Sequence, residues 1–349
     1  MAGFEVEVIG TDACVDRRLT SVAEVEVPYY PGLTVGVPSV PAVVDALADG
    51  RYDLLHVCTP GPAGVAALLT ARLLGLPVTG SHHTELEAYA ALRSDDPLVA
   101  AGMRMALATF FSQCRVVLSP SRAADRGLLA LGIDAERIAR WDRGVDLERF
   151  SPAHRRERSD DRVHVLYSGR LTEEKGAGLL ADAFLAARAR DPRLHLLLAG
   201  GGPEEVALRE RLGRAATFLG WLEGGELATA YASADVFLFC SQTDTFGQVV
   251  LEAQASGLPV VAIAAGGPAE LVEDGRSGVL CPPRIDELAS AVTRLAASPA
   301  ARRRLARGGL VAVADRSWEA SLARLGAGWH GALVVTPQRA DVAATRPAG

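Results

Sequence analysis

Two basic residues lie in one short loop of the sequence and could bind an anion. Arg170 and Lys175 fall within residues 168–176, directly after an apolar segment typical of a buried strand. Lys175 is the only lysine among the 36 basic residues, and an ammonium is a compact point charge that a guanidinium does not replace at a phosphate. Gly169 lets the backbone approach a ligand closely. The loop therefore favours stabilisation of a departing phosphate; the alternative is a solvated loop with an arginine–glutamate pair.

The most specific segment covers residues 244–259, which read D-T-F-G-Q-V-V-L-E-A-Q-A-S-G-L-P. Asp244 precedes an expected helix, and Glu252 lies about one turn inside it. Three residues stand at the helix start: Phe246, Gly247 and Gln248. Backbone N–H groups at such a position lack partners within the helix and can bind a phosphate oxygen, while carboxylates can bind sugar hydroxyls. For Glu252 alone, a carboxylate that stabilises the first helical turn is an equally good interpretation.

Two further loops follow apolar segments and carry weaker signals. Residues 199–204 read A-G-G-G-P-E, and glycines such as Gly201 before a helix favour either an anion site or a tight turn. Residues 80–85 read G-S-H-H-T-E, where His83 could hydrogen-bond a sugar; adjacent histidines without further ligands make a poor metal site. Because no Asp-x-Asp occurs in the chain, we expect no metal and no cofactor, and protein cations at any diphosphate.

These loops depend on the elements that precede them, and short apolar segments alternate with helical patterns along the whole chain. Strands are expected over residues 4–9, 54–57, 76–79, 116–119, 138–141, 163–167, 194–199, 217–219, 236–239, 260–263 and 278–280. Helices are expected over residues 63–74, 97–113, 122–131, 179–190, 204–212, 226–233, 249–256, 285–297 and 316–329. The alternation predicts an α/β fold with two open parallel sheets, which bind ligands beyond the carboxyl ends of their strands.

The length of 349 residues suits two domains. We expect a first domain over residues 1–150, a polar linker over 151–162 and a second domain over 163–312. A helix over 313–331 should pack back on the first domain, and the tail over 332–349 should be disordered.

The composition limits the classes of binding partner and the cellular compartment that we expect. A net charge of -6 gives no electrostatic footprint for nucleic acid. Five scattered cysteines without C-x-x-C are typical of small buried hydrophobic residues in a reducing compartment. No membrane-spanning segment or leader is visible, so we expect a cytoplasmic protein, with peripheral contact at the inner face of the plasma membrane left open.

Together these strings resemble family 4 of the retaining glycosyltransferases, which have the GT-B architecture of two facing Rossmann-like domains. The resemblance runs from Phe4 to about Trp329, and residues 244–259 match the E-x7-E region of the family. This string, with G-S-H-H-T-E-L and R-G-V-D-L-E-R-F-S-P, is most similar to bacterial α-mannosyltransferases that use GDP-mannose and to glycolipid glycosyltransferases. The resemblance implies a metal-independent retaining hexosyltransferase that moves a sugar, best assigned as mannose from GDP-mannose, to a lipid or saccharide acceptor.

The resemblance also implies a role for each residue singled out. The donor diphosphate would lie at Arg170 and Lys175, and the ribose at Glu252. The sugar would lie at Asp244, with His83 beside the reaction centre. Further donor contacts are implied for Gly169, Gly201, Leu219, Phe246, Gly247 and Gln248. Glu270, in G-G-P-A-E, would lie near the cleft.

The chain departs from the family pattern at three places. Asp244 stands where the family usually has glutamate, and Arg143 where it often has asparagine. The opening strand and glycine-rich loop of the family are not visible before residues 4–9, which indicates either a start inside a longer reading frame or a reduced active site. That departure motivates an alternative, a nucleotide-sugar-binding pseudo-glycosyltransferase or partner-dependent subunit. An epimerase of the same fold would need acid/base carboxylates that these motifs do not supply.

Overall fold

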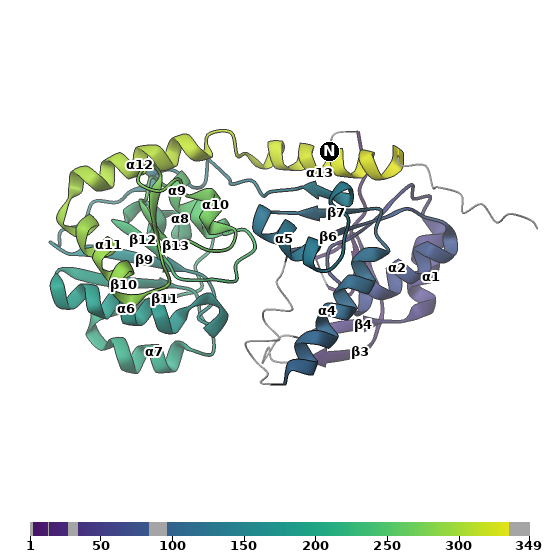
Figure 1. Ribbon diagram of the computed structural model, residues 1–349, viewed down its shortest axis with the longest axis horizontal. Helices are drawn as coiled ribbons and strands as arrows, with labels where there is room; N and C mark the ends of the chain where they lie inside the picture. The colour runs from purple at the N-terminus through teal and green to yellow at the C-terminus, as the bar shows by residue number, and fades with distance from the viewer. Residues whose placement is uncertain (1–2, 13, 27–33, 84–95, 335–349) are drawn as a thin grey trace, which may run out of the picture.

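The computed structural model describes residues 3–12, 14–26, 34–83 and 96–334. The chain forms two α/β domains, each built on a parallel sheet, and a C-terminal helix runs along the first of them (Figure 1). The prediction of an α/β fold with two parallel sheets is confirmed. Among the described residues, no helix is both long enough and apolar enough to cross a lipid bilayer.

The second domain contains a six-stranded sheet in which every neighbouring pair is parallel. Its strands are β9 (Val163–Ser168), β10 (Leu194–Ala199), β11 (Ala216–Gly220), β12 (Val236–Phe239), β13 (Val260–Ile263) and β14 (Gly278–Cys281). They are arranged β11-β10-β9-β12-β13-β14, so the strand order reverses between β9 and β12. In doubly wound sheets this switch point is where ligands bind.

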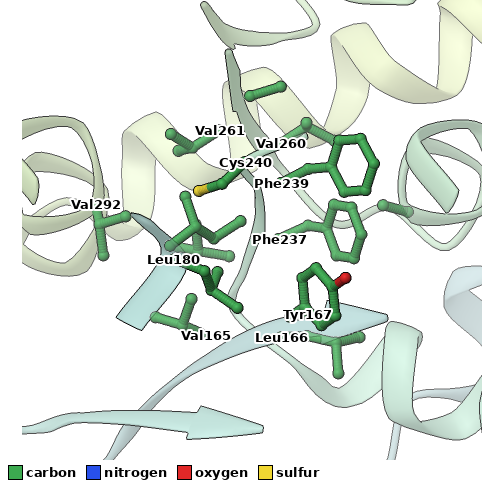
Figure 2. Packing of buried hydrophobic residues seen from close by; sticks show 14 of the residues in the cluster. Val165, Leu166, Tyr167, Leu180, Phe237, Phe239, Cys240, Val260, Val261 and Val292 are labelled. Carbon is green, nitrogen blue, oxygen red and sulfur yellow. The ribbon is translucent and has the colours of Figure 1, made fainter. Parts of the chain in front are cut away.

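Helices cover both faces of this sheet, which explains why its strands are continuous apolar runs. The helices are α6 (Ala177–Arg190), α7 (Glu205–Leu212), α8 (Gly224–Ser233), α9 (Gln248–Ala255), α10 (Pro268–Leu271), α11 (Ile285–Ala297) and α12 (Pro299–Val313). Figure 2 shows Leu180 of α6 and Val292 of α11 on one side of the sheet, and the rings of Tyr167, Phe237 and Phe239 on the other. The Tyr167 ring of β9 stacks on the Phe239 ring of β12 with their centroids 6.5 Å apart, and Leu166 pairs with Phe237, so this core holds β9 and β12 next to each other.

The first domain has a four-stranded parallel sheet in the order β5-β6-β7-β8. The strands are β5 (Leu55–Val57), β6 (Val78–Ser81), β7 (Val116–Ser119) and β8 (Ile138–Arg140), and the helices are α1 (Val40–Asp49), α2 (Pro62–Leu74), α4 (Pro97–Ser112) and α5 (Arg122–Ala130). Four short strands precede them: β1 (Ile9–Gly10), β2 (Arg17–Arg18), β3 (Ser21–Glu26) and β4 (Thr34–Pro38). The expected strand over residues 4–9 is wrong except at Ile9, because only Ile9 and Gly10 find a pairing partner, in β2.

Helix α13 (Trp318–Val334) packs on the sheet of the first domain. Leu325 and Trp329 are buried there with Leu118 of β7. The helix extends beyond the expected end at residue 331, so the expectation of a disordered tail is wrong for residues 332–334. The remainder of that tail lies outside the described residues, and the domain boundaries stay predictions.

The expectation of uniformly buried cysteines is wrong at two positions. Cys114, Cys240 and Cys281 are buried, but Cys14 and Cys58 are exposed. Burial raises the pKa of the Cys114 thiol to about 12, which keeps it unreactive.

Candidate active site

The loops after β9 and β12 meet at the switch point of the second sheet. The hydroxyls of Ser241 and Thr243 both donate to the backbone oxygen of Glu174, at 3.0 Å each. Gly176 has a left-handed φ of 73°, and a Cβ there would lie 2.2 Å from the backbone oxygen of Cys240. Only glycine fits this close approach, so the loop that carries Lys175 is held directly beside the loop that carries Asp244.

Lys175 and Asp244 form an ion pair at this meeting point. The distance from Lys175 Nζ to Asp244 Oδ2 is 2.7 Å, and their side chains are 17% and 16% exposed. The other carboxylate oxygen, Oδ1, accepts the backbone N–H groups of Phe246 at 3.1 Å and Gly247 at 2.7 Å. Burial alone would raise the pKa of Asp244, but Lys175 and these two amides outweigh burial and lower it. Asp244 is therefore ionised, and it occupies the amides and the ammonium that were expected to receive a donor.

Arg170 also faces a carboxylate. Its guanidinium lies 3.6 Å from Glu174 Oε1, and the Glu174 side chain is fully buried. The Arg170 side chain is 39% exposed, so the guanidinium remains within reach of a ligand at the surface. The loop thus combines the two arrangements that the sequence left open, an exposed cation and an arginine–glutamate pair.

Glu252 lies in α9 next to a buried tyrosine. Tyr231 Oη donates to Glu252 Oε2 at 3.0 Å. Burial raises the pKa of Glu252 to about 7, because desolvation disfavours the charged form more strongly than Tyr231, Gln248 and Arg149 favour it. Glu252 is thus a polar group inside the second domain, and its charge changes near neutral pH. A carboxylate that only stabilised the first turn of an exposed helix would not be buried in this way.

The triple glycine after β10 packs against the loop after β9. The Leu171 N–H donates to the Gly201 oxygen at 2.9 Å, and a Cβ at Gly200 would lie 2.0 Å from the Gly169 oxygen. Leu219 is the penultimate residue of β11, and the next residue, Gly220, accepts the Gly200 N–H at 2.6 Å. The glycine run therefore makes a close-packed turn, and donor contacts at Gly201 and Leu219 stay predictions.

His83 brings the first domain to the same place. Its backbone oxygen accepts the hydroxyl of Thr245 at 2.8 Å, and its ring meets the Trp141 ring edge to face with centroids 4.9 Å apart. Burial and the nearby Arg143 guanidinium lower the pKa of His83 to about 3. The imidazole is thus neutral at physiological pH, and its buried Nδ1 has no hydrogen-bond partner among the described residues. It can exchange hydrogen bonds with a ligand but does not carry charge.

Two more contacts join the domains around this point. Gln248 Nε2 donates to the Gly144 oxygen at 3.0 Å. The carboxylate of Glu270 accepts the backbone N–H groups of Arg122 at 2.9 Å and Ala123 at 2.8 Å. Gln248 therefore faces the first domain, and Glu270 lies at the seam between the domains.

The structure therefore brings most of the predicted residues together. Lys175, Asp244, Phe246 and Gly247 form one cluster, and His83 joins it through Thr245. Glu252 is held by Tyr231 instead, and no contact in the described residues links it to Lys175. The sequence analysis does not single out Thr245 or Tyr231. For Thr245 the only signal is its position inside the segment 244–259.

A cavity of about 340 Å3 lies at the opposite edge of the sheet, where the strands begin. Asp235, directly before β12, and Pro259, directly before β13, line it together with Arg155 and Arg302. Arg155 is bonded to Asp235 and two backbone oxygens, and Arg302 to two backbone oxygens of α11. The positive charges of Arg155 and Arg302 are therefore engaged within the protein, and Arg303 also lines the cavity.

Comparison with known proteins places the chain in a family. Residues 1–149 match the profile described as Glycosyltransferase Family 4, and residues 162–298 match the profile described as Glycosyl transferases group 1. The chain is 35% identical over 270 residues to a GDP-mannose-dependent alpha-mannosyltransferase of Corynebacterium glutamicum, which covers 75% of this chain and 63% of that protein. It is 37% identical over 300 residues to the protein of the same name from Mycolicibacterium smegmatis, covering 83% of this chain and 76% of that one.

The fold is shared with solved structures of glycosyltransferases. The structure of Anabaena HepE in complex with UDP and glucose superposes with a TM-score of 0.70 at 23% identity, covering 83% of this chain and 81% of that one. The GT-B fold of two Rossmann-like domains is thereby confirmed. This chain spans 63% of the length of the Corynebacterium relative, whereas the alignment with the Mycolicibacterium relative covers more than two thirds of both proteins. The chain belongs to family 4 of the glycosyltransferases.

Proposed function

We propose that this chain is a retaining hexosyltransferase that moves a sugar from a nucleotide diphosphate donor, without a metal ion, to a lipid or saccharide acceptor. The observation that carries the proposal is the cluster of Lys175, Asp244 and the start of α9 at the switch point, with His83 of the other domain joined to it. Mannose from GDP-mannose is the proposed donor, because relatives that are 35% and 37% identical bear names with that specificity.

The chemistry follows from the charges in the cluster. As the bond between sugar and diphosphate breaks, negative charge grows on the departing phosphate and positive charge on the sugar ring. Lys175 and Arg170 would stabilise the phosphate, and Asp244 would be displaced from the ammonium towards the sugar. Removing one such fixed electrostatic contact in other enzymes lowers turnover by about a hundredfold to thousandfold.

Retention requires the acceptor hydroxyl to approach from the face that the phosphate leaves. A departing phosphate oxygen would then take the proton of the hydroxyl. His83, neutral and with no partner at Nδ1 in the described part of the chain, would bind a sugar hydroxyl instead of acting as the base. Domain closure would exclude water from this step.

The test is a donor panel. The chain is incubated with GDP-mannose, UDP-glucose and ADP-glucose, with EDTA present, and nucleotide release is followed with and without mixed glycolipid and saccharide acceptors. We expect release from GDP-mannose that rises when an acceptor is present, and NMR of the product should show the α anomer. Release that requires a divalent cation, or a β anomer, would contradict the proposed mechanism.

One observation favours the alternative of a binding protein without transfer activity. Both cations of the loop already face carboxylates, Lys175 at 2.7 Å and Arg170 at 3.6 Å. If these pairs persist when nucleotide binds, the diphosphate gains little stabilisation. Calorimetry that detects GDP binding together with no transfer to any acceptor in the panel would support this alternative.

A lipid acceptor would require contact with a membrane surface, and α2 offers an apolar one. Val65, Leu69 and Leu73 lie four residues apart along its outer side and are 41%, 56% and 85% exposed. Residues at this spacing share one helical face and can insert into an interface. Co-sedimentation with phosphatidylglycerol vesicles should decrease when these three residues are changed to serine; unchanged sedimentation would favour a saccharide acceptor.

A further inference from the structure

Glu270 of the second domain caps a helix of the first. Helix α5 begins at Arg122, after the N-cap residue Ser121. Ser121 Oγ accepts the Ala124 N–H at 3.1 Å, while the Glu270 carboxylate accepts the N–H groups of Arg122 and Ala123 at 2.9 and 2.8 Å. A carboxylate at this position also interacts favourably with the helix dipole. Figure 1 shows α10 and α5 as facing elements of the two domains.

The same segment is packed directly on the loop of Asp244. The Gly267 N–H donates to the backbone oxygen of Asp244 at 2.8 Å. A Cβ at Gly267 would lie 2.4 Å from both Phe246 Cα and the Thr245 oxygen, so no side chain fits between the two segments. The segment that leads to Glu270 and residues 244–247 therefore form one packed unit, in which Asp244 binds both the Gly247 N–H and the Lys175 ammonium.

We propose that Glu270 is a positioning residue for sugar transfer, which holds α5 of the first domain against the donor loop and so sets the closed arrangement of the domains. The inference rests on the proposed transferase function. In the structure Thr245 donates to the His83 backbone oxygen, so the residue beside the proposed reaction centre is held next to the donor loop. Glu270 binds two backbone N–H groups of the other domain, and it acts through that contact.

The helix start allows a matched pair of variants. Arg122→Pro removes one of the two N–H donors, and proline is tolerated at the first helical position because that N–H has no partner within the helix. Ser121, which would precede the proline, has the extended backbone that this requires, with φ -154° and ψ 162°. Arg122→Ala removes the same side chain and keeps the N–H. Glu270→Ala removes the acceptor, and Glu273→Ala removes a nearby exposed carboxylate that pairs with Arg276.

The first measurement needs no substrate. Amides at a helix start exchange freely unless they have a hydrogen-bond partner. Hydrogen exchange of the Ala123 amide, measured by NMR on the full-length chain, therefore reports its contact with Glu270. We expect exchange to rise about fivefold or more in E270A and to stay unchanged in E273A. A fivefold change corresponds to about 1 kcal/mol, which is typical of a carboxylate at a helix N-terminus. Unchanged exchange in E270A would overturn the proposal.

The second measurement separates positioning from folding. With GDP-mannose as donor, kcat for nucleotide release should fall about fivefold in both E270A and R122P, while R122A and E273A stay within about twofold of the parent. The Kd for GDP, measured by calorimetry, should stay constant, because GDP is proposed to bind the second domain. If R122P behaves like R122A, the proposal is wrong. If no donor is turned over by the parent protein, the transferase proposal fails, whereas the Ala123 exchange still decides whether Glu270 joins the domains.

Discussion

Glu252 should make the stability of the second domain fall as pH rises from about 4.5 to about 7. Its pKa is raised from 4.5 to about 7 by burial beside Tyr231. At pH values between 4.5 and about 7, Glu252 is protonated in the native protein and ionised in the unfolded chain. Unfolding therefore releases a proton, and the free energy of unfolding decreases as pH rises. The extra stability is fully present below about pH 4.5 and is lost as pH passes about 7.

The magnitude follows from the size of the shift. Each pKa unit corresponds to about 1.36 kcal/mol, so a shift of about 2.5 units costs about 3 kcal/mol once Glu252 is ionised. Glu252→Gln does not ionise, and its amide oxygen can still accept the Tyr231 hydroxyl. We expect E252Q to match the parent near pH 4.5 and to exceed it by up to about 3 kcal/mol at pH 8.

The assay is urea unfolding of both proteins at half-unit steps from pH 4.5 to 8.5. Tyr231→Phe provides the matched comparison, because losing the donor to Glu252 should move the pH of the stability decrease upwards. A difference between E252Q and the parent that stays flat across the series would refute the assignment of a raised pKa to this carboxylate.

Three further predictions concern the donor loop and the reaction centre. Lys175→Ala should lower kcat for nucleotide release by about a hundredfold to thousandfold, and Lys175→Arg should not restore it, because a planar guanidinium does not replace the ammonium; a fully active K175R would contradict this. Gly267→Ala should weaken GDP binding in calorimetry, because its Cβ would meet Phe246 Cα at 2.4 Å, whereas Gly178→Ala, with nothing within 4 Å, should bind normally. Because the pKa of His83 is about 3, the rate profile from pH 5 to 9 should keep its shape in H83A; loss of an inflection near pH 6.5 would show that His83 titrates there.

The sequence predicts the second domain closely because its strands are buried on both faces. Residues 236–239 and 260–263 are uninterrupted apolar segments between polar loops, and they coincide with β12 and β13. Residues 4–9 alternate apolar and acidic side chains like a strand, yet pairing requires a neighbour, and only Ile9 and Gly10 have one. Helix α12 was not predicted from the sequence, because its several arginines and the adjacent glycines at 308 and 309 interrupt the helical spacing of apolar residues.

The candidate site, too, was predictable from the sequence only in part. Its location is predictable because loops after parallel strands meet at one edge, and this places residues 175 and 244 together. The pairing of Lys175 with Asp244 joins residues 69 positions apart and depends on the strand order, which the pattern does not specify. The capping of Phe246 and Gly247 by Asp244 also depends on the loop conformation.

The proposed mechanism requires a diphosphate to bind at this switch point and to take over the contacts that Asp244 makes in the free protein. A crystal structure with GDP is the decisive experiment. We expect a phosphate oxygen about 3 Å from Lys175 Nζ and beside the start of α9, with the 2.7 Å pair between Lys175 and Asp244 lengthened or broken. A nucleotide bound elsewhere, or one bound nearby with that pair intact and no phosphate within reach of Lys175, would show that the mechanism is wrong.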